Sequence, residues 1–255
     1  MTPAPIDPHW AQYLRWLYGF HSLSVKQKLL TMAQRYAVED PEGRRFFVVR
    51  PPKMALRFLA GAVGFILYLM ALFLAYPYFR DGEMLPFFAI LFVATYVARL
   101  VVTLLAPYRD IIVYADEQES LPLMYMSQDN KFGLTQRFTI YDLSGQPVAV
   151  ARRLVVWALV QRRWQAVTLD GRLILRLQED SLLLAALRRY LGTLWGLLRT
   201  NFDILLPDGT RIGEYNRKLT LTDQYVLTLD QDPHFLVDRR VVLALAILLD
   251  TGEGR

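Results

Sequence analysis

Residues 238–250 read DRRVVLALAILLD, and this stretch decides the fold. The nine residues 241–249 are apolar on every side of a helix, so no face of that helix suits water. A helix of this length measures only about 14 Å, which is too short to cross a bilayer. We therefore expect a central helix over residues 238–250 that is buried in protein, and the cavity of a β-barrel is a suitable enclosure.

Four segments upstream repeat one layout, in which an aromatic residue opens an extended run and a turn ending in Gly closes it. Asp and Gly in such turns are typical of tight β-hairpins rather than of catalysis, because glycine adopts positive φ without steric cost. Each repeat is followed by another β-rich run, so the four hairpins and the runs between them supply enough strands for a barrel. The repeats are YAVEDPEG (36–43), FTIYDLSG (138–145), WQAVTLDG (164–171) and FDILLPDG (202–209).

Two apolar stretches, residues 54–76 and 85–106, interrupt this pattern. Each has the roughly 20 residues that a helix needs to span a hydrocarbon core of about 30 Å. Each contains one charged residue, Arg57 near the start of the first and Arg99 within the second. The connector at 77–84 is short, which predicts an antiparallel transmembrane hairpin. Arg99 is near enough to the helix end to snorkel to the interface, the alternative being a functional charge inside the membrane.

The distribution of basic residues sets the expected orientation. Of the 29 Lys and Arg residues, nine precede or begin the first apolar stretch, Arg80 alone lies in the tip, and nineteen follow. The positive-inside rule then predicts an integral membrane protein with both termini and the barrel in the cytoplasm. The expected organisation is an N-terminal amphipathic helix at 1–21, the first barrel strands at 22–53, the transmembrane hairpin at 54–107, and the rest of the barrel with its central helix at 108–255.

Composition excludes several classes of function. The 255-residue chain is 54% hydrophobic and 21% charged, which fits a protein with membrane-embedded and water-exposed parts. It has no Cys and only three scattered His residues, so disulfides and metal clusters are not expected. We find no Ser/His/Asp set, P-loop or dinucleotide fingerprint, and we expect neither an enzyme nor a bound cofactor. The net charge of +5 suits nucleic acid or anionic lipid, and the membrane tether favours lipid over nucleic acid.

Parts of the chain resemble the tubby-like superfamily, specifically its branch of LURP-one-related proteins and phospholipid scramblases. These parts are VKQKLLTMAQRYAVEDPEG (25–43), the hairpin at 138–152, and NFDILLPDGTRIG (201–213) with the apolar stretch at 235–250. The resemblance covers roughly residues 22–50 and 108–250. It implies a barrel of about twelve strands around a central hydrophobic C-terminal helix.

The resemblance to scramblases also implies calcium-associated acidic residues just before that helix. This chain has only Asp223, Asp230 and Asp232 in the corresponding stretch. They lack the regular oxygen spacing of a dedicated calcium loop, so no metal site is expected there.

Two further stretches have an amphipathic pattern. In LRRYLGTLWGLLR (187–199), Arg188, Arg189 and Arg199 fall in one arc of a helix, while Trp195 and the leucines occupy the rest. This pattern is typical of a basic helix lying in a membrane interface, and it also suits packing on the barrel or on a partner subunit. An Asp-Pro pair at 7–8 starts a second predicted helix, whose aromatic side suits the headgroup layer or the barrel surface.

Two functions fit these features. The first is a membrane-anchored, scramblase-like protein that binds anionic phospholipid and organises or translocates it. The second is a membrane-anchored interaction or scaffold module without lipid-moving activity, whose barrel docks a protein partner or forms a homo-oligomer. Basic residues near a bilayer each add roughly 1 kcal/mol of attraction to anionic lipid, although the same residues also suit solvated strand edges. The predicted lipid-binding residues are Arg152, Arg153, Arg162, Arg163, Arg188, Arg189, Trp195 and Arg199.

Overall fold

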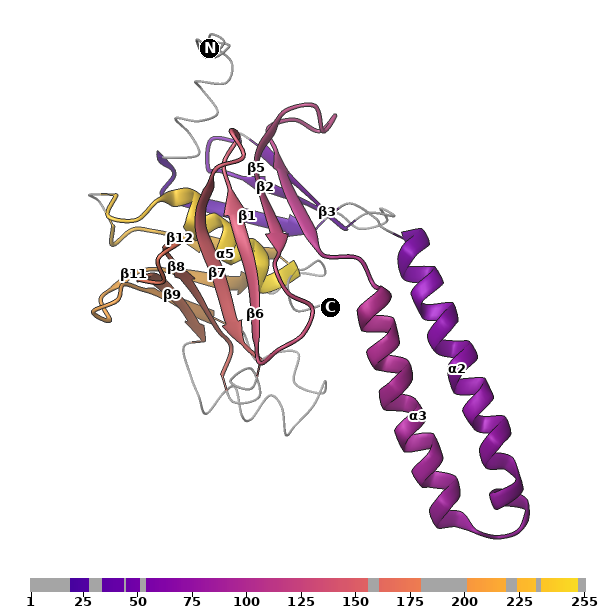
Figure 1. Ribbon diagram of the computed structural model, residues 1–255. Coiled ribbons are helices and arrows are strands. Elements are labelled where there is room, and N and C mark those ends of the chain that lie inside the picture. The colour runs from indigo at the N-terminus through magenta and orange to yellow at the C-terminus, as the bar shows by residue number, and fades with distance from the viewer. Residues whose placement is uncertain are drawn as a thin grey trace. The chain divides into compact units, whose positions relative to one another are not determined.

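The computed structural model describes residues 19–27, 34–43, 45–50, 54–155, 161–179, 201–218, 224–232 and 235–251 (Figure 1). The chain forms two compact units. One combines Met1–Pro51 with Arg109–Arg255, and the other is Pro52–Tyr108. The first unit is a β-barrel, and the second is a pair of helices inserted into its sequence.

The barrel is closed and has twelve strands. Each strand pairs antiparallel with its neighbours in sequence, and β1 closes the ring against β12 through Ser22↔Thr228 and Lys26↔Gln224. The prediction of a barrel of about twelve strands is confirmed. The strands are β1 (Ser22–Gln27), β2 (Gln34–Glu39), β3 (Arg45–Arg50), β4 (Asp110–Tyr114), β5 (Pro122–Gln128), β6 (Thr135–Tyr141), β7 (Pro147–Leu154), β8 (Arg163–Val167), β9 (Leu173–Glu179), β10 (Asn201–Leu205), β11 (Arg211–Lys218) and β12 (Gln224–Thr228).

Side chains alternate along each strand between the barrel interior and its outer surface. In β6, for example, Phe138 and Ile140 are buried, whereas Arg137 is exposed. The interior is filled by α5 (Arg239–Thr251), drawn in yellow among the strands in Figure 1. Every residue from 241 to 249 is buried, as expected for a helix that is apolar on all sides. The prediction of a central C-terminal helix is therefore confirmed.

One end of the barrel carries tight turns. Gly43, Gly145, Gly171 and Gly209 have φ values of +81°, +75°, +90° and +90°, which other residues adopt only with strain. Each glycine N–H donates to the carbonyl three residues earlier, at 3.0–3.1 Å. These are the four Asp/Gly turns expected from the sequence, and the prediction of turn chemistry is confirmed. The β4–β5 connection and the entry to α5 lie at the same end, which we call the turn end.

The opposite end carries the remaining connections, because neighbouring strands run antiparallel. They are β1–β2, β3–β4, β5–β6, β7–β8, β9–β10 and β11–β12. The chain leaves the barrel after β3 and returns at β4, with the helical unit inserted between them. The pairing Val49↔Ile112 joins β3 to β4, so the insertion does not interrupt the sheet. We call this the linker end.

The helical unit consists of α2 (Met54–Arg80) and α3 (Met84–Leu105). The small residues Ala60, Gly64 and Ala71 recur on one side of α2 and are buried. Gly64 lies so close to α3 that a Cβ there would collide with the side chain of Val102. The other faces expose large apolar side chains, and both helices are long and apolar enough to cross a membrane.

The first helix is longer than the sequence predicts. It continues past Tyr76 to Arg80, with Pro77 inside it. The backbone N–H of Asp81 donates to the carbonyl of Pro77 at 2.9 Å, so hydrogen bonding resumes after the proline. A proline removes only one donor, and this loss is tolerated close to a helix end. The connector between the helices is correspondingly shorter than the predicted 77–84.

Candidate functional site

Arginine side chains gather on the outer surface of β7, β8 and β9. The register places Arg152 opposite Gln165, and Gln165 opposite Arg176. The neighbouring residues Ala151 and Ala166 are buried in the core, so the polar row lies on the outer face. The Nε of Arg152 donates to the Oε1 of Gln165 at 3.1 Å, which fixes the first guanidinium beside the glutamine.

Arg163 joins this group from the start of β8. It lies two residues before Gln165 on the same face and opposite Gln178, which makes it a diagonal neighbour of Arg176. The pKa of Arg163 is lowered, first by burial and second by the positive charge of Arg176. Its guanidinium donates to the Oε1 of Gln161 at 3.4 Å. Two like charges are therefore held near each other by the strand register.

Arg176 completes the set, which we call the arginine cluster: Arg152, Arg163 and Arg176 around Gln165. Within the part of the chain that the structure describes, the buried Nε of Arg176 has no hydrogen-bond partner. Buried donors in proteins are usually satisfied, so this N–H marks a place for an acceptor. Guanidinium groups bind phosphate and carboxylate oxygens well, because their planar donors match these groups in geometry and charge.

The structure separates the arginine pairs that the sequence suggests. Arg153 lies on the opposite face of β7 from Arg152, with its guanidinium carbon 5.2 Å from the ring centroid of the buried Trp164. It also donates to the Oε1 of Gln136 at 3.0 Å. The backbone N–H of Arg162 donates to the Oε2 of Glu179 at 3.3 Å. Arg152 and Arg153, although adjacent in sequence, therefore lie on different faces, and only Arg152 belongs to the arginine cluster.

Four predicted lipid-binding residues, Arg188, Arg189, Trp195 and Arg199, lie outside the described residues. The same holds for the amphipathic helix expected at 187–199 and for residues 1–18 of the predicted N-terminal helix. Arg176 is the member that sequence reasoning missed. Its position in RLILRL (172–177) shows a strand, but only the register with β8 brings it beside Gln165.

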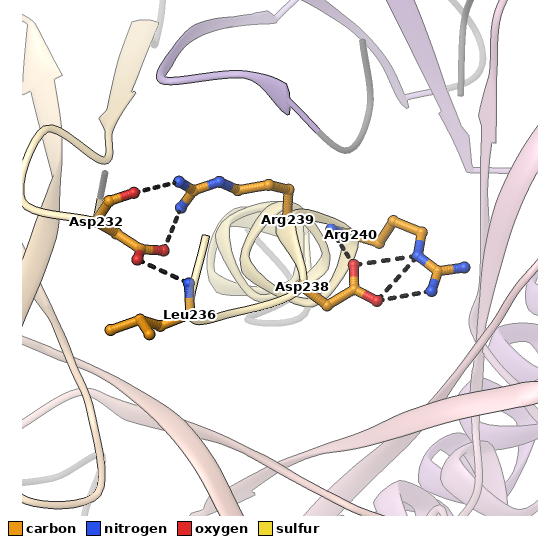
Figure 2. Close-up of polar contacts among 5 residues, drawn as sticks. All are labelled: Asp232, Leu236, Asp238, Arg239 and Arg240. Carbon is orange, nitrogen blue, oxygen red and sulfur yellow. Dashed lines mark hydrogen bonds and ion pairs between the residues drawn. The ribbon is translucent and has the colours of Figure 1, made fainter. Parts of the chain in front are cut away.

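A second polar group lies where the chain enters α5 (Figure 2). Arg239 donates from Nη1 to the Oδ2 of Asp232 at 2.8 Å and from Nη2 to the Asp232 carbonyl at 2.9 Å, and both side chains are almost fully buried. The Oδ1 of Asp232 accepts the backbone N–H of Leu236 at 2.8 Å. Burial lowers the pKa of Arg239, and the charge of Asp232 opposes that shift. Every oxygen of Asp232 thus serves an internal contact.

The Asp232–Arg239 ion pair fixes the loop that precedes the central helix, and we call this pair the latch. Asp238 and Arg240 form a second, more exposed pair at 2.6 Å beside it. Among the described residues, no group of three or more His, Asp or Glu side chains could hold a metal ion. We read this end of α5 as structural rather than as a binding site, because its charges neutralise each other.

Sequence comparison identifies the family of this chain. The family model described as LURP-one-related matches residues 104–250, which is more than half of the chain. The chain belongs to the LURP-one-related family. This family is a member of the tubby-like superfamily. In this LURP-one-related protein the matched segment runs from the end of α3 through α5 and includes the whole arginine cluster. No curated protein and no solved structure matches the chain.

Proposed function

We propose that this LURP-one-related protein is anchored in a membrane by α2 and α3 and binds anionic phospholipid headgroups through its barrel. The family supports a tubby-like lipid-binding function. The two apolar helices support a membrane anchor. The arginine cluster supports a preference for anionic over neutral headgroups, because it concentrates positive charge on one part of the barrel surface.

The observation that carries this proposal is the diagonal position of Arg163 and Arg176 on the neighbouring strands β8 and β9. Two guanidinium groups held close together repel each other, and a phosphate between them would remove the repulsion and accept hydrogen bonds from both. Surface arginines that serve only solubility gain nothing from such an arrangement.

We propose that both termini and the barrel are cytoplasmic and that the α2–α3 turn is on the far side. The excess of Lys and Arg on either side of the two helices supports this orientation. Because the chain has no Cys, Asp81→Cys creates a unique label site. Labelling of this cysteine by an impermeant reagent from the cytoplasmic side alone would reverse the proposed topology.

Binding can be tested on the full-length protein in detergent. We expect short-chain phosphatidylserine to bind and short-chain phosphatidylcholine to bind much more weakly. The variants Arg163→Gln and Arg176→Gln should each weaken phosphatidylserine binding about tenfold or more, since a charge-assisted hydrogen bond contributes about 1.5–3 kcal/mol. Arg172→Gln is the matched control, because Arg172 is an exposed arginine at the turn end, paired with Asp170 at 2.8 Å. Equal weakening by all three changes would argue against the arginine cluster.

Lipid movement is a separate activity and needs its own measurement. A liposome flip assay on the purified protein, with and without calcium, distinguishes a protein that translocates lipid from one that organises it in one leaflet. Flip rates equal to those of protein-free liposomes, together with headgroup binding, would assign binding alone.

A further inference from the structure

The linker end of the barrel exposes a group of large apolar side chains on two neighbouring connections. Phe132 and Leu134 belong to the β5–β6 connection, Leu154 is the last residue of β7, and Val155 follows it. Leu134 is 68% exposed and Leu154 is 42% exposed. The backbone N–H of Val155 donates to the Leu134 carbonyl at 2.8 Å, so the two connections lie side by side. We call these four residues the linker-end patch.

The connection that presents Phe132 and Leu134 is held in shape by its own polar side chains. Asn130 donates from Nδ2 to the carbonyls of Phe132 and Thr135, both at 2.7 Å, and its Oδ1 accepts the backbone N–H of Arg137 at 3.0 Å. The Oγ1 of Thr139 donates to the carboxylate of Asp129 at 2.9 Å. The exposed apolar side chains therefore lie on an ordered loop. Binding of this loop to another surface would lose little conformational entropy.

Basic residues border the patch. Arg137 follows the loop on β6, and Arg152 and Arg153 directly precede Leu154 on β7. Exposed apolar side chains next to Arg137 and Arg152, which the register places opposite each other, match a bilayer surface, where acyl chains lie beneath a layer of phosphates.

The two ends of the barrel also differ in charge. Among the described residues, the strand-to-strand connections of the turn end hold eight acidic residues and one basic residue. The described residues of the linker-end connections, outside the helical unit, hold three basic residues, Arg109, Lys131 and Arg162, and one acidic residue, Asp129. An anionic surface would attract the linker end and repel the turn end.

The patch is also tied to the point where the chain returns from α3. The backbone N–H of Gln128, next to the β5–β6 loop, donates to the carbonyl of Arg109 at 3.0 Å, and the N–H of Arg109 donates to the Oε1 of Gln128 at 3.3 Å. Only residues 106–108 separate Arg109 from the end of α3 at Leu105, and an extended chain over these four residue steps spans at most about 14 Å. A short tether therefore joins this end of the barrel to a helix that is apolar enough to cross a membrane.

We propose that the linker-end patch inserts into the headgroup layer of the membrane that α2 and α3 cross, and that the bordering arginines meet anionic phospholipid there. This inference rests on the proposed membrane anchor and headgroup binding, and it adds the apolar residues and the end of the barrel that face the lipid. The membrane anchor keeps the barrel close to the bilayer, so the effective concentration of the membrane surface at the patch is high. Weak insertion of the patch is then enough to dock the barrel on the membrane.

The test uses single cysteines in the full-length protein, reconstituted in nanodiscs of phosphatidylcholine with phosphatidylserine. Leu134→Cys is compared with Leu169→Cys, a residue of similar exposure (59%) at the turn end, and Leu154→Cys with Leu143→Cys, which is 40% exposed at the turn end. Each cysteine carries an environment-sensitive fluorophore, and lipids with a nitroxide near the headgroup act as quenchers. We expect loss of emission at 134 and 154 and unchanged emission at 143 and 169.

Other outcomes separate this inference from the proposed function. If all four positions escape quenching while Arg163→Gln still weakens phosphatidylserine binding, insertion is wrong and headgroup binding stands. If 134 is quenched while Arg163→Gln changes nothing, insertion stands and the headgroup site is wrong. If the fluorophore on Leu134→Cys escapes lipid quenching, and the unlabelled Leu134→Cys variant crosslinks between two copies in one disc, the patch is a protein interface and the proposal is overturned.

Discussion

The two ends of the barrel are built from the same strands but differ in almost every property. The turn end is acidic, closed by glycine turns at positive φ, and latched by the buried Asp232–Arg239 pair where α5 enters. The linker end is basic, presents the linker-end patch and receives the chain from α3. The turn end thus holds a buried ion pair at the start of the central helix, whereas the linker end exposes large apolar side chains.

From this difference we infer that the contacts that stabilise the fold and the residues that contact lipid lie at opposite ends of one domain. A change at the turn end or in the core should affect folding first. A change at the linker end should affect lipid contact first. Matched substitutions at the two ends can test this division of roles.

We expect the largest loss of stability from a substitution in the buried central helix, α5. Leu245 is fully buried on α5, so Leu245→Asp places an unpaired carboxylate inside the barrel. We expect a loss of several kcal/mol, comparable with the whole stability of a domain. Thermal unfolding in detergent, with hydrogen exchange of β8 as a local readout, would measure it. Leu169→Asp at the exposed turn end is the control and should melt near the wild-type temperature; normal melting of Leu245→Asp would contradict the central-helix assignment.

The next effect concerns the latch itself. Arg239→Met leaves the buried carboxylate of Asp232 without its partner and should destabilise the barrel by about 3–5 kcal/mol. Adding Asp232→Asn removes the uncompensated charge, so the double variant should recover much of the loss. Arg240→Met is the matched control, because Arg240 pairs with the more exposed Asp238. If Arg239→Met and Arg240→Met were equally mild in the same unfolding measurement, the turn end would not depend on a buried ion pair.

Most of the barrel could be predicted from the sequence, because its signals are local. The four Asp/Gly turns mark hairpins within eight-residue segments, and residues 241–249 can only suit an enclosed helix. The end of α2 was harder to predict, since Pro77 reads as a helix stop although the helix continues to Arg80. Local rules thus give the elements and leave some of their ends uncertain by a turn.

The candidate site was less predictable because it depends on register. Arg152 and Arg153 are adjacent in sequence, but successive residues of a strand point to opposite faces. Arg176 comes from another strand and joins the cluster only through its pairing with Gln165. The linker-end patch is equally non-local, since Leu134 meets Val155 across two connections. No spacing within a single segment could have indicated either grouping.

We expect the smallest change in stability from substitutions in the linker-end patch. They should change lipid contact while leaving the fold intact. Phe132→Ser combined with Leu134→Ser removes two exposed apolar side chains without touching the Asn130 hydrogen bonds. We expect the free energy of unfolding in detergent to change by less than about 0.5 kcal/mol, as for most surface substitutions. In nanodiscs containing phosphatidylserine, hydrogen exchange of residues 129–135 should become faster than in the wild-type protein, because the loop no longer reaches the lipid. A matched pair at the turn end, Leu143→Ser with Leu169→Ser, should leave exchange there unchanged between detergent and nanodiscs. If the Phe132 and Leu134 changes instead destabilised the barrel in detergent by as much as the latch variant, these residues would be part of the folding core, and the division of roles between the two ends would fail.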